Sequence, residues 1–102
     1  MGLNDLHKSL IYIAGRRLVN RLEFVGKVFE ASSYAEMINR LIPENINILN
    51  DLAISYMNVN KLKLAKEKFE QVLVLDNNNT VAICHYAFIL KTFDNRLHEA
   101  VL

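Results

Sequence analysis

Three histidines and one cysteine are the side chains of this chain best suited to bind a metal or attack a substrate. A mononuclear iron(II) site needs two histidines and a carboxylate that converge on the metal, but His7, His85 and His98 fall on three different predicted helices. His98 and Glu99 are adjacent, so they point away from each other on a helix. The histidine next to Cys84, His85, is adjacent in sequence and therefore does not face the thiol on a helix. No other residue can be assigned as the base that would activate Cys84. We expect no catalytic, cofactor-binding or metal-binding residues, with Cys84 as a packed thiol and His85 partly buried and hydrogen-bonded.

Four lysines between residues 61 and 68 form the densest run of positive charge. They could mark the binding site of an acidic partner. However, Glu67 and Glu70 lie among and just after them, and Lys66 and Glu70 are four residues apart, where opposite charges pair on a helix. The run therefore favours a solvated helix face.

Asn78-Asn79-Thr80 matches the acceptor motif for N-linked glycosylation. The motif falls in a polar connection, which we expect to be exposed, so Asn78 is a candidate glycosylation site. The alternative is a chance occurrence, because residues 76–79 are all Asp or Asn.

The composition indicates that helices must position these residues. One proline and three glycines in 102 residues leave little room for sheets and turns, and the 52% of hydrophobic residues argues for a packed chain. The formal charge of +1 does not suggest a nucleic-acid or anionic membrane partner. A single cysteine excludes an internal disulfide. We find no apolar run of the ~20 residues that a membrane helix needs, and no targeting signal.

Residues 46–79 carry a 34-residue pattern of apolar side chains at helical spacing, interrupted by a turn at Asn58-Val59-Asn60, where Asn tolerates the left-handed conformation. Small residues, Ala53 and Ala65, lie where two antiparallel helices would cross closely. The pattern has the spacing of a tetratricopeptide repeat, a helix–turn–helix unit that buries its apolar face only by stacking on neighbours. The matching positions are Leu49, Leu52, Ala53, Tyr56, Asn60, Leu62, Ala65, Phe69, Val72 and Leu75.

The same spacing extends in both directions from this repeat. Residues 80–102 restart the period at Thr80, with a turn predicted at Asp94-Asn95 and a second helix cut off at Leu102. Residues 1–45 fit a degenerate hairpin, with helices over 5–24 and 27–41. The sequence thus predicts an all-α, tetratricopeptide-like superhelix of stacked helical hairpins.

First helices of such repeats line the concave side of the solenoid, where partners bind. The outward-turned positions there form a candidate binding face of Asn47, Asn50, Ile54, Asn58, Val81, Phe88 and Lys91. Without a following helix, some apolar side chains of residues 80–102 would be uncovered and could drive self-association: Ile83, Ala87, Leu90, Ala100 and Val101.

Several short sequence segments, from about residue 16 onward, resemble one enzyme family, the aspartyl/asparaginyl β-hydroxylases. The most specific is HYAFILK, from His85 to Lys91; AKEKFEQVL, from Ala65 to Leu73, supports it. Shorter matches are Asn50-Asp51-Leu52, Arg21 followed by Phe24-Val25-Gly26, and Arg40-Leu41 before Pro43-Glu44-Asn45.

The resemblance implies a repeat domain in the lumen of the endoplasmic reticulum that helps form the substrate channel of an oxygenase domain. The oxygenase uses Fe(II) and 2-oxoglutarate to hydroxylate Asp or Asn in epidermal-growth-factor-like domains. Its ligands would lie beyond Leu102, so none is assigned to a residue here. The chain would then be a non-catalytic scaffold whose partner is the protein substrate or the oxygenase domain. Two alternatives stay open: a free-standing adaptor that binds a peptide or helix, and a fragment with no independent role.

Overall fold

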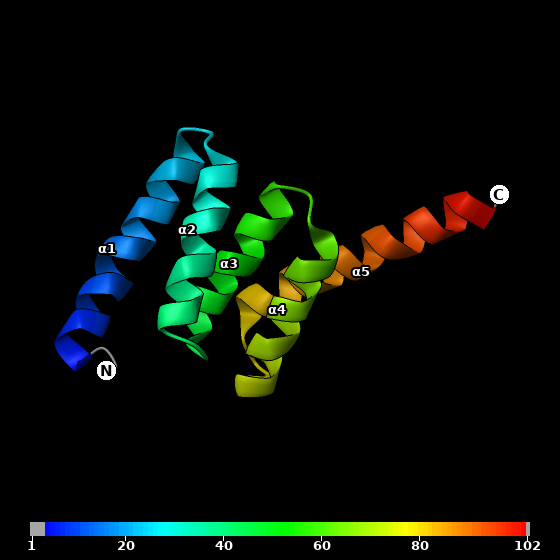
Figure 1. Cartoon of the computed structure of the whole chain (residues 1–102). Helices are drawn as coiled ribbons and strands as arrows, with labels where there is room; N and C mark the ends of the chain where they lie inside the picture. Colours follow the sequence, from blue (N-terminus) through cyan, green and yellow to red (C-terminus); the bar gives the residue numbers. More distant parts are fainter. Residues whose placement is uncertain (1–3, 102) are drawn as a thin grey trace.

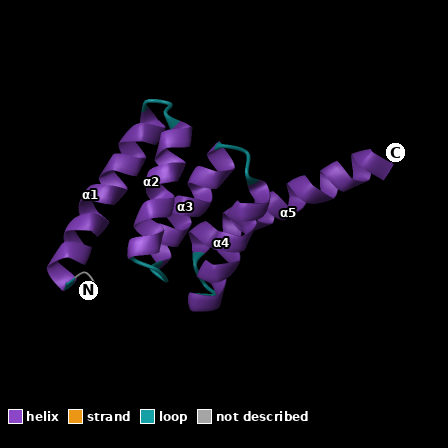
Figure 2. Ribbon diagram, in the orientation of Figure 1, coloured by secondary structure: helices purple, strands orange, loops and turns teal. Residues whose placement is uncertain are grey.

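The structure is a computed structural model that describes the backbone of residues 4–101 and the side chains of residues 4–93. Five helices follow one another along this part of the chain (Figures 1 and 2): α1 (Asp5–Phe24), α2 (Val28–Leu41), α3 (Ile46–Asn58), α4 (Leu62–Leu75) and α5 (Thr80–Val101). The pairs α1–α2 and α3–α4 form antiparallel hairpins, and α2 packs on α3. The predicted all-α fold of stacked helical hairpins is confirmed.

The two hairpin turns are built alike. Gly26 and Asn60, 34 residues apart, both adopt the left-handed conformation, with φ angles of 85° and 61°. Glycine adopts it without steric cost, and asparagine tolerates it better than most residues. Three backbone N–H···O bonds close the first turn and recur 34 residues later: Val25–Arg21, Gly26–Glu23 and Lys27–Leu22, then Val59–Ser55, Asn60–Met57 and Lys61–Tyr56.

The starts of α3 and α5 repeat with the same spacing. Asn45 Oδ1 accepts a hydrogen bond from Ile48 N at 3.1 Å, and Asn79 Oδ1 accepts one from Ala82 N at 3.0 Å. Each asparagine satisfies a backbone donor that the first turn of a helix leaves unpaired. The 34-residue period therefore appears in caps and turns as well as in the apolar pattern.

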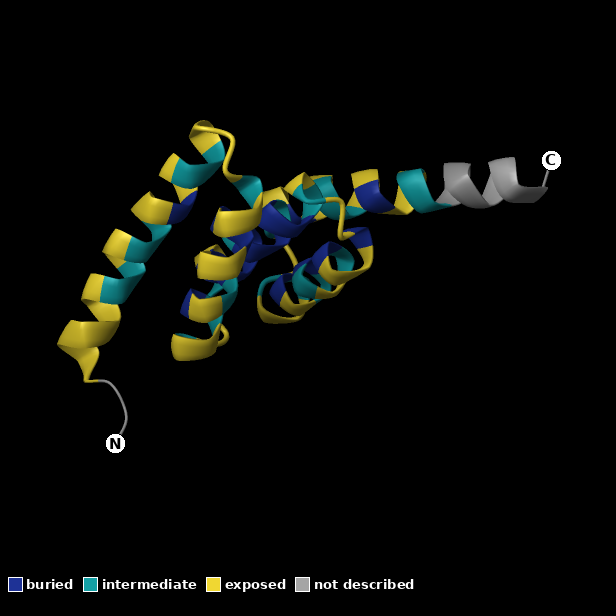
Figure 3. Ribbon diagram, turned by 45° about the horizontal axis from the view of Figure 1, so that its top comes forward, coloured by how far each residue is buried: buried dark blue, intermediate teal, exposed yellow. Residues whose placement is uncertain are grey.

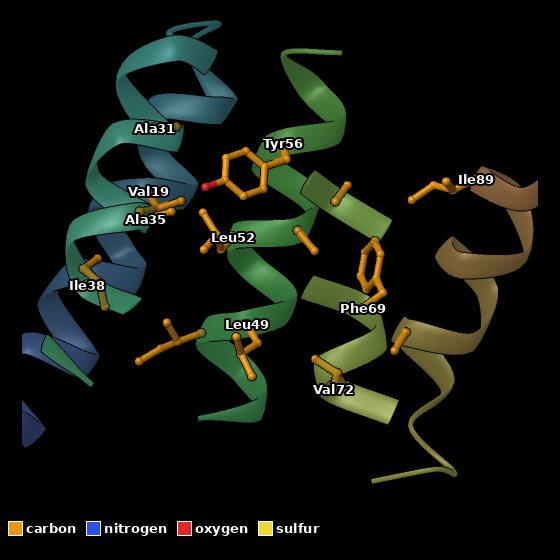
Figure 4. Close-up of a cluster of buried hydrophobic side chains, with 14 residues drawn as sticks. Val19, Ala31, Ala35, Ile38, Leu49, Leu52, Tyr56, Phe69, Val72 and Ile89 are labelled. Atoms are coloured by element: carbon orange, nitrogen blue, oxygen red, sulfur yellow. The ribbon is translucent and has the colours of Figure 1, made fainter. Parts of the chain in front are cut away.

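A single core runs through all five helices (Figure 4). Ala53 and Ala65 are completely buried, as the close crossing of α3 and α4 requires. Phe69 on α4 is also completely buried and lies toward α5, while Tyr56 on α3 lies toward α1 and α2. Burial of both aromatic rings confirms the helical register predicted for residues 46–75.

The turn predicted at Asp94-Asn95 is wrong, because α5 continues as one helix to Val101 and extends away from the other helices (Figure 1). Asp and Asn cost only about 0.7 kcal/mol each inside a helix. The backbone hydrogen bonds of α5 therefore continue through Asp94 and Asn95 at little cost. The side chains of His98, Ala100 and Val101 lie outside the described residues.

The face of α5 that was expected to be uncovered is exposed where its side chains are described, at Ile83, Ala87 and Leu90. Self-association through this face stays a prediction. Within the described residues, no helix combines the length and the apolar character needed to cross a membrane.

Candidate functional site

A polar seam joins α1 to α3 on the side where the first helices of the hairpins meet. Arg16 Nε donates to Asp51 Oδ2 at 2.6 Å and Arg16 Nη2 to Asp51 Oδ1 at 3.4 Å, a two-pronged ion pair. The hydrogen bond to Asp51 raises the pKa of Arg16, so the guanidinium stays charged. Beside it, Asn47 Nδ2 donates to Tyr12 Oη at 2.8 Å.

One carboxylate closes the other end of the seam. Glu23, near the end of α1, accepts hydrogen bonds from Ser55 Oγ at 2.7 Å and from Asn58 Nδ2 at 2.9 Å. Ser55 is completely buried, so its hydroxyl needs this acceptor. The seam fixes α3 against α1 and uses polar groups that would otherwise be available to a ligand.

The predicted binding face is therefore only partly open. Asn50 was expected to face outward, but it is 6% exposed and its Nδ2 donates to Asn79 Oδ1 at 3.1 Å. The prediction that Asn50 faces outward is therefore wrong: its side chain is hydrogen-bonded to Asn79, the residue that caps the start of α5. Asn47 and Asn58 are exposed yet bonded to α1, and Ile54 is half-buried.

An open hollow remains between α3 and α5. It has a volume of about 370 Å³ and is lined by Met57, Cys84, His85 and Phe88. The Phe88 ring is 59% exposed, so the hollow presents apolar surface to solvent. From the predicted face, Val81 and Lys91 are also exposed on α5.

Cys84 is exposed, so the expectation of a packed thiol is wrong. α5 buries Ala82 and Ile89, and it has no second helix against its other side among the described elements. Residue 84 falls outside the narrow stripe that α4 covers. The sequence could not reveal this, because the apolar residues of α5 surround the helix rather than mark one face.

His85 has the partly buried, hydrogen-bonded environment predicted for it. Its Nδ1 donates to the carbonyl oxygen of Val81 at 2.8 Å. Its ring stacks on Phe69, with centroids 5.4 Å apart and planes 17° apart. His7 is exposed on α1, and among the described side chains no three His, Cys, Asp or Glu residues gather as a metal site.

Glu70 anchors α5 to α4 at the edge of the stack. It accepts a hydrogen bond from Tyr86 Oη at 3.0 Å and pairs with Lys66 at 3.3 Å. The bond to Glu70 raises the pKa of the Tyr86 phenol. The predicted Lys66–Glu70 pair is thus present, on a partly exposed helix face.

Asn78 lies exposed in the turn between α4 and α5, as the sequence predicted. Its backbone N–H donates to Asp76 Oδ1 at 3.2 Å, and the motif's Thr80 is exposed at the first position of α5. The position is accessible, and its modification stays a prediction.

Comparison with known proteins supports the resemblance to the β-hydroxylases that the short sequence segments indicated. No family model matches the chain. Over 99 residues the chain is 28% identical to the aspartyl/asparaginyl beta-hydroxylase of Homo sapiens, and equally to that of Mus musculus. The match spans 97% of this chain but only 13% of each relative. The chain therefore resembles one short region of these hydroxylases.

Proposed function

We propose that this chain is a tetratricopeptide-type scaffold that holds a protein substrate beside a separate oxygenase domain and has no catalytic activity of its own. The observation that carries the proposal is the match over 97% of the chain to a β-hydroxylase region. The repeated turns and caps support it, because stacked hairpins are suited to present an extended binding surface.

The hollow between α3 and α5 is the surface through which we expect the substrate to bind. The α1–α3 seam is closed by hydrogen bonds, whereas the hollow offers the exposed Phe88 ring with Lys91 nearby on the same helix. An exposed aromatic side chain beside a shallow depression is a typical anchor of protein interfaces. By resemblance, the substrate is an epidermal-growth-factor-like domain in the endoplasmic reticulum, and Fe(II) and 2-oxoglutarate are bound by the oxygenase domain.

Calorimetric titration of the chain with a disulfide-bonded epidermal-growth-factor-like domain tests this function. We expect saturable binding that Phe88→Ala weakens about tenfold, the effect of losing one interface anchor. Val74→Ala is the matched control, because Val74 is 86% exposed on α4, away from the hollow. Absence of binding, or equal loss in both variants, would refute the assignment of the surface.

A second experiment tests the partnership with an oxygenase domain. The human relative's oxygenase domain, prepared without its repeat region, is assayed with and without this chain in excess. We expect the chain to raise the hydroxylation rate of the protein substrate and to show no turnover alone. An unchanged rate would argue against the scaffold role.

The alternative function is a free-standing adaptor that binds a linear peptide or helix in the same hollow. The open, apolar character of the hollow favours it independently of the relatives. Binding of linear peptides, with none of the folded domain, would favour the adaptor.

A further inference from the structure

The N-terminal end of the stack contains a hollow that the proposed function does not use. α1 has 20 residues and its antiparallel partner α2 has 14, so the first turns of α1 extend past the end of α2 (Figure 1). Every residue from 4 to 10 is exposed in this extension (Figure 3). The connection between α2 and α3 closes the hollow, which we call the α1 corner. It has a volume of about 340 Å³ and is lined by Lys8, Ser9, Tyr12, Ile13, Ile42 and Asn45.

The hydroxyl of Tyr12 has one hydrogen-bonding function left for a ligand. A phenol oxygen accepts through two lone pairs and donates through one hydrogen. Asn47 Nδ2 donates to this oxygen at 2.8 Å and Arg16 Nη1 donates to it at 3.2 Å, so both lone pairs are engaged. No group between residues 4 and 93 accepts the hydroxyl hydrogen. Tyr12 can therefore act toward a ligand only as a donor.

The side chain of Asn45 is restricted in the same way. Its Oδ1 accepts a hydrogen bond from Ile48 N at 3.1 Å, which fixes the amide at the start of α3. The Nδ2 group keeps two N–H donors. Lys8 also has donors only, whereas Ser9 can donate or accept. The polar side of the α1 corner is thus dominated by donors, two of them held in place by hydrogen bonds.

The carboxylates near the α1 corner do not supply an acceptor for all these donors. Asp51 is held by Arg16, and Glu44 lines a different hollow, between α3 and α4. Asp5 is exposed on α1, three residues before Lys8, and is the remaining opposing charge. Because one lysine stands against Asp5, the selection comes from the donors rather than from net charge. This balance favours a singly charged acceptor over a dianion.

An ionised carboxylate meets these requirements, because it accepts several hydrogen bonds, has no donor and carries a single charge. The volume lies at the lower end of the range of about 300–1,000 Å³ for small-ligand sites, which combine apolar walls with a few polar groups. We propose that the α1 corner binds the carboxylate of a ligand that also carries an apolar group. Tyr12, Asn45 and Lys8 donate to the carboxylate. Ile13 and Ile42 contact the apolar group.

An NMR titration of the full chain tests this site, because the side-chain amide of Asn45 gives signals of its own. N-acetyl-leucine is the probe, and N-acetyl-leucinamide, which lacks the carboxylate, is the matched control. We expect N-acetyl-leucine to shift the Asn45 side-chain signals saturably, with a Kd of about 1–10 mM for a ligand of this size. The control compound should leave the signals unchanged.

Three variants separate the contributions, with the backbone amide of Ile13 as the reporter. Asn45→Asp keeps an oxygen that caps α3 but replaces the donor by a carboxylate oxygen, so binding should be lost while the thermal melt by circular dichroism is retained. Lys8→Gln should weaken binding about threefold, and Lys63→Gln, on α4, should not. Asp5→Asn should strengthen binding by a similar factor, because it removes the opposing charge.

Two arms of the titration identify the source of the carboxylate. A peptide that ends in a free leucine should bind more tightly than N-acetyl-leucine, and lose binding on amidation of its end, if the ligand is a chain terminus. Equal affinity of peptide and probe would assign the α1 corner to small carboxylates. Phe88→Ala should bind the probe as the unchanged chain does, so the result is independent of the hollow between α3 and α5.

Three results would overturn the proposal. They are an unshifted Asn45 signal at about tenfold the expected Kd, equal shifts with N-acetyl-leucinamide, and undiminished binding to a folded Asn45→Asp variant.

Discussion

Phe69 links the last two helices to the rest of the stack, and its removal is the sharpest test of the packing. The ring is completely buried, lies between α4 and α5, and stacks on His85 at 5.4 Å. Truncating a buried phenylalanine to alanine costs about 3–5 kcal/mol, through lost transfer energy and the remaining cavity. A domain of this size has a total stability of about 5–15 kcal/mol. We therefore expect Phe69→Ala to remove a large part of the free energy of unfolding.

Urea and thermal unfolding followed by circular dichroism measure this loss. The midpoint temperature should fall by about 15 °C or more. Phe24→Ala is the matched control: it removes the same atoms from a position that is 89% exposed and should change stability by less than about 0.5 kcal/mol. Phe69→Leu leaves a smaller cavity, so its loss of stability should lie between the losses for Phe69→Ala and Phe24→Ala. Equal effects at positions 69 and 24, or a Phe69→Ala loss below about 1 kcal/mol, would refute the packing.

Three further outcomes follow from other parts of the structure. Gly26→Ala should lower the free energy of unfolding in urea by about 1 kcal/mol, because a residue with a Cβ is strained at the left-handed φ of 85°, although no atom would contact that Cβ. Asn60→Gly, at the equivalent turn, should not destabilise the fold. An unchanged stability of Gly26→Ala would contradict this reasoning. Burial, aided by Glu36, raises the pKa of Tyr56 to about 12, above its ordinary value of 10.0. As the pH rises, the unfolded chain loses the Tyr56 proton before the folded chain does. The contribution of Tyr56 to the free energy of unfolding should therefore be complete below pH 10 and decline as the pH approaches 12. Tyr56→Phe should make this decline shallower, and an unchanged slope would contradict the role of Tyr56. Expression through a secretory pathway should yield glycan on Asn78 that Asn78→Gln abolishes, and an unmodified secreted chain would exclude the site.

Local rules accounted for the helices and turns. The bounds predicted for the first helix match α1, and the second differs from α2 by one residue at its start. Of the turn predicted over Asn58-Val59-Asn60, Asn60 adopts the left-handed conformation and Asn58 is the last residue of α3. These features depend on neighbours within a few residues, so periodicity and turn chemistry are sufficient to predict them.

The binding face was less predictable, because it depends on which helices meet. Helical spacing placed Asn50 outward, but its exposure depends on Asn79, 29 residues away, at the start of α5. Similarly, Asn58 is engaged by Glu23 on α1. A polar residue at a given helical position looks the same in the sequence whether its partner is water or another helix.

The sequence by itself determined the helical class, the 34-residue spacing and the buried stripe of α3 and α4, because burial there repeats every turn of the helix. Only the tertiary structure decided that Cys84 is open to solvent, that α5 runs past Asp94, and that Asn50 is buried against Asn79. These properties arise from contacts, or missing contacts, between segments far apart in the chain. Local periodicity carries no information about them.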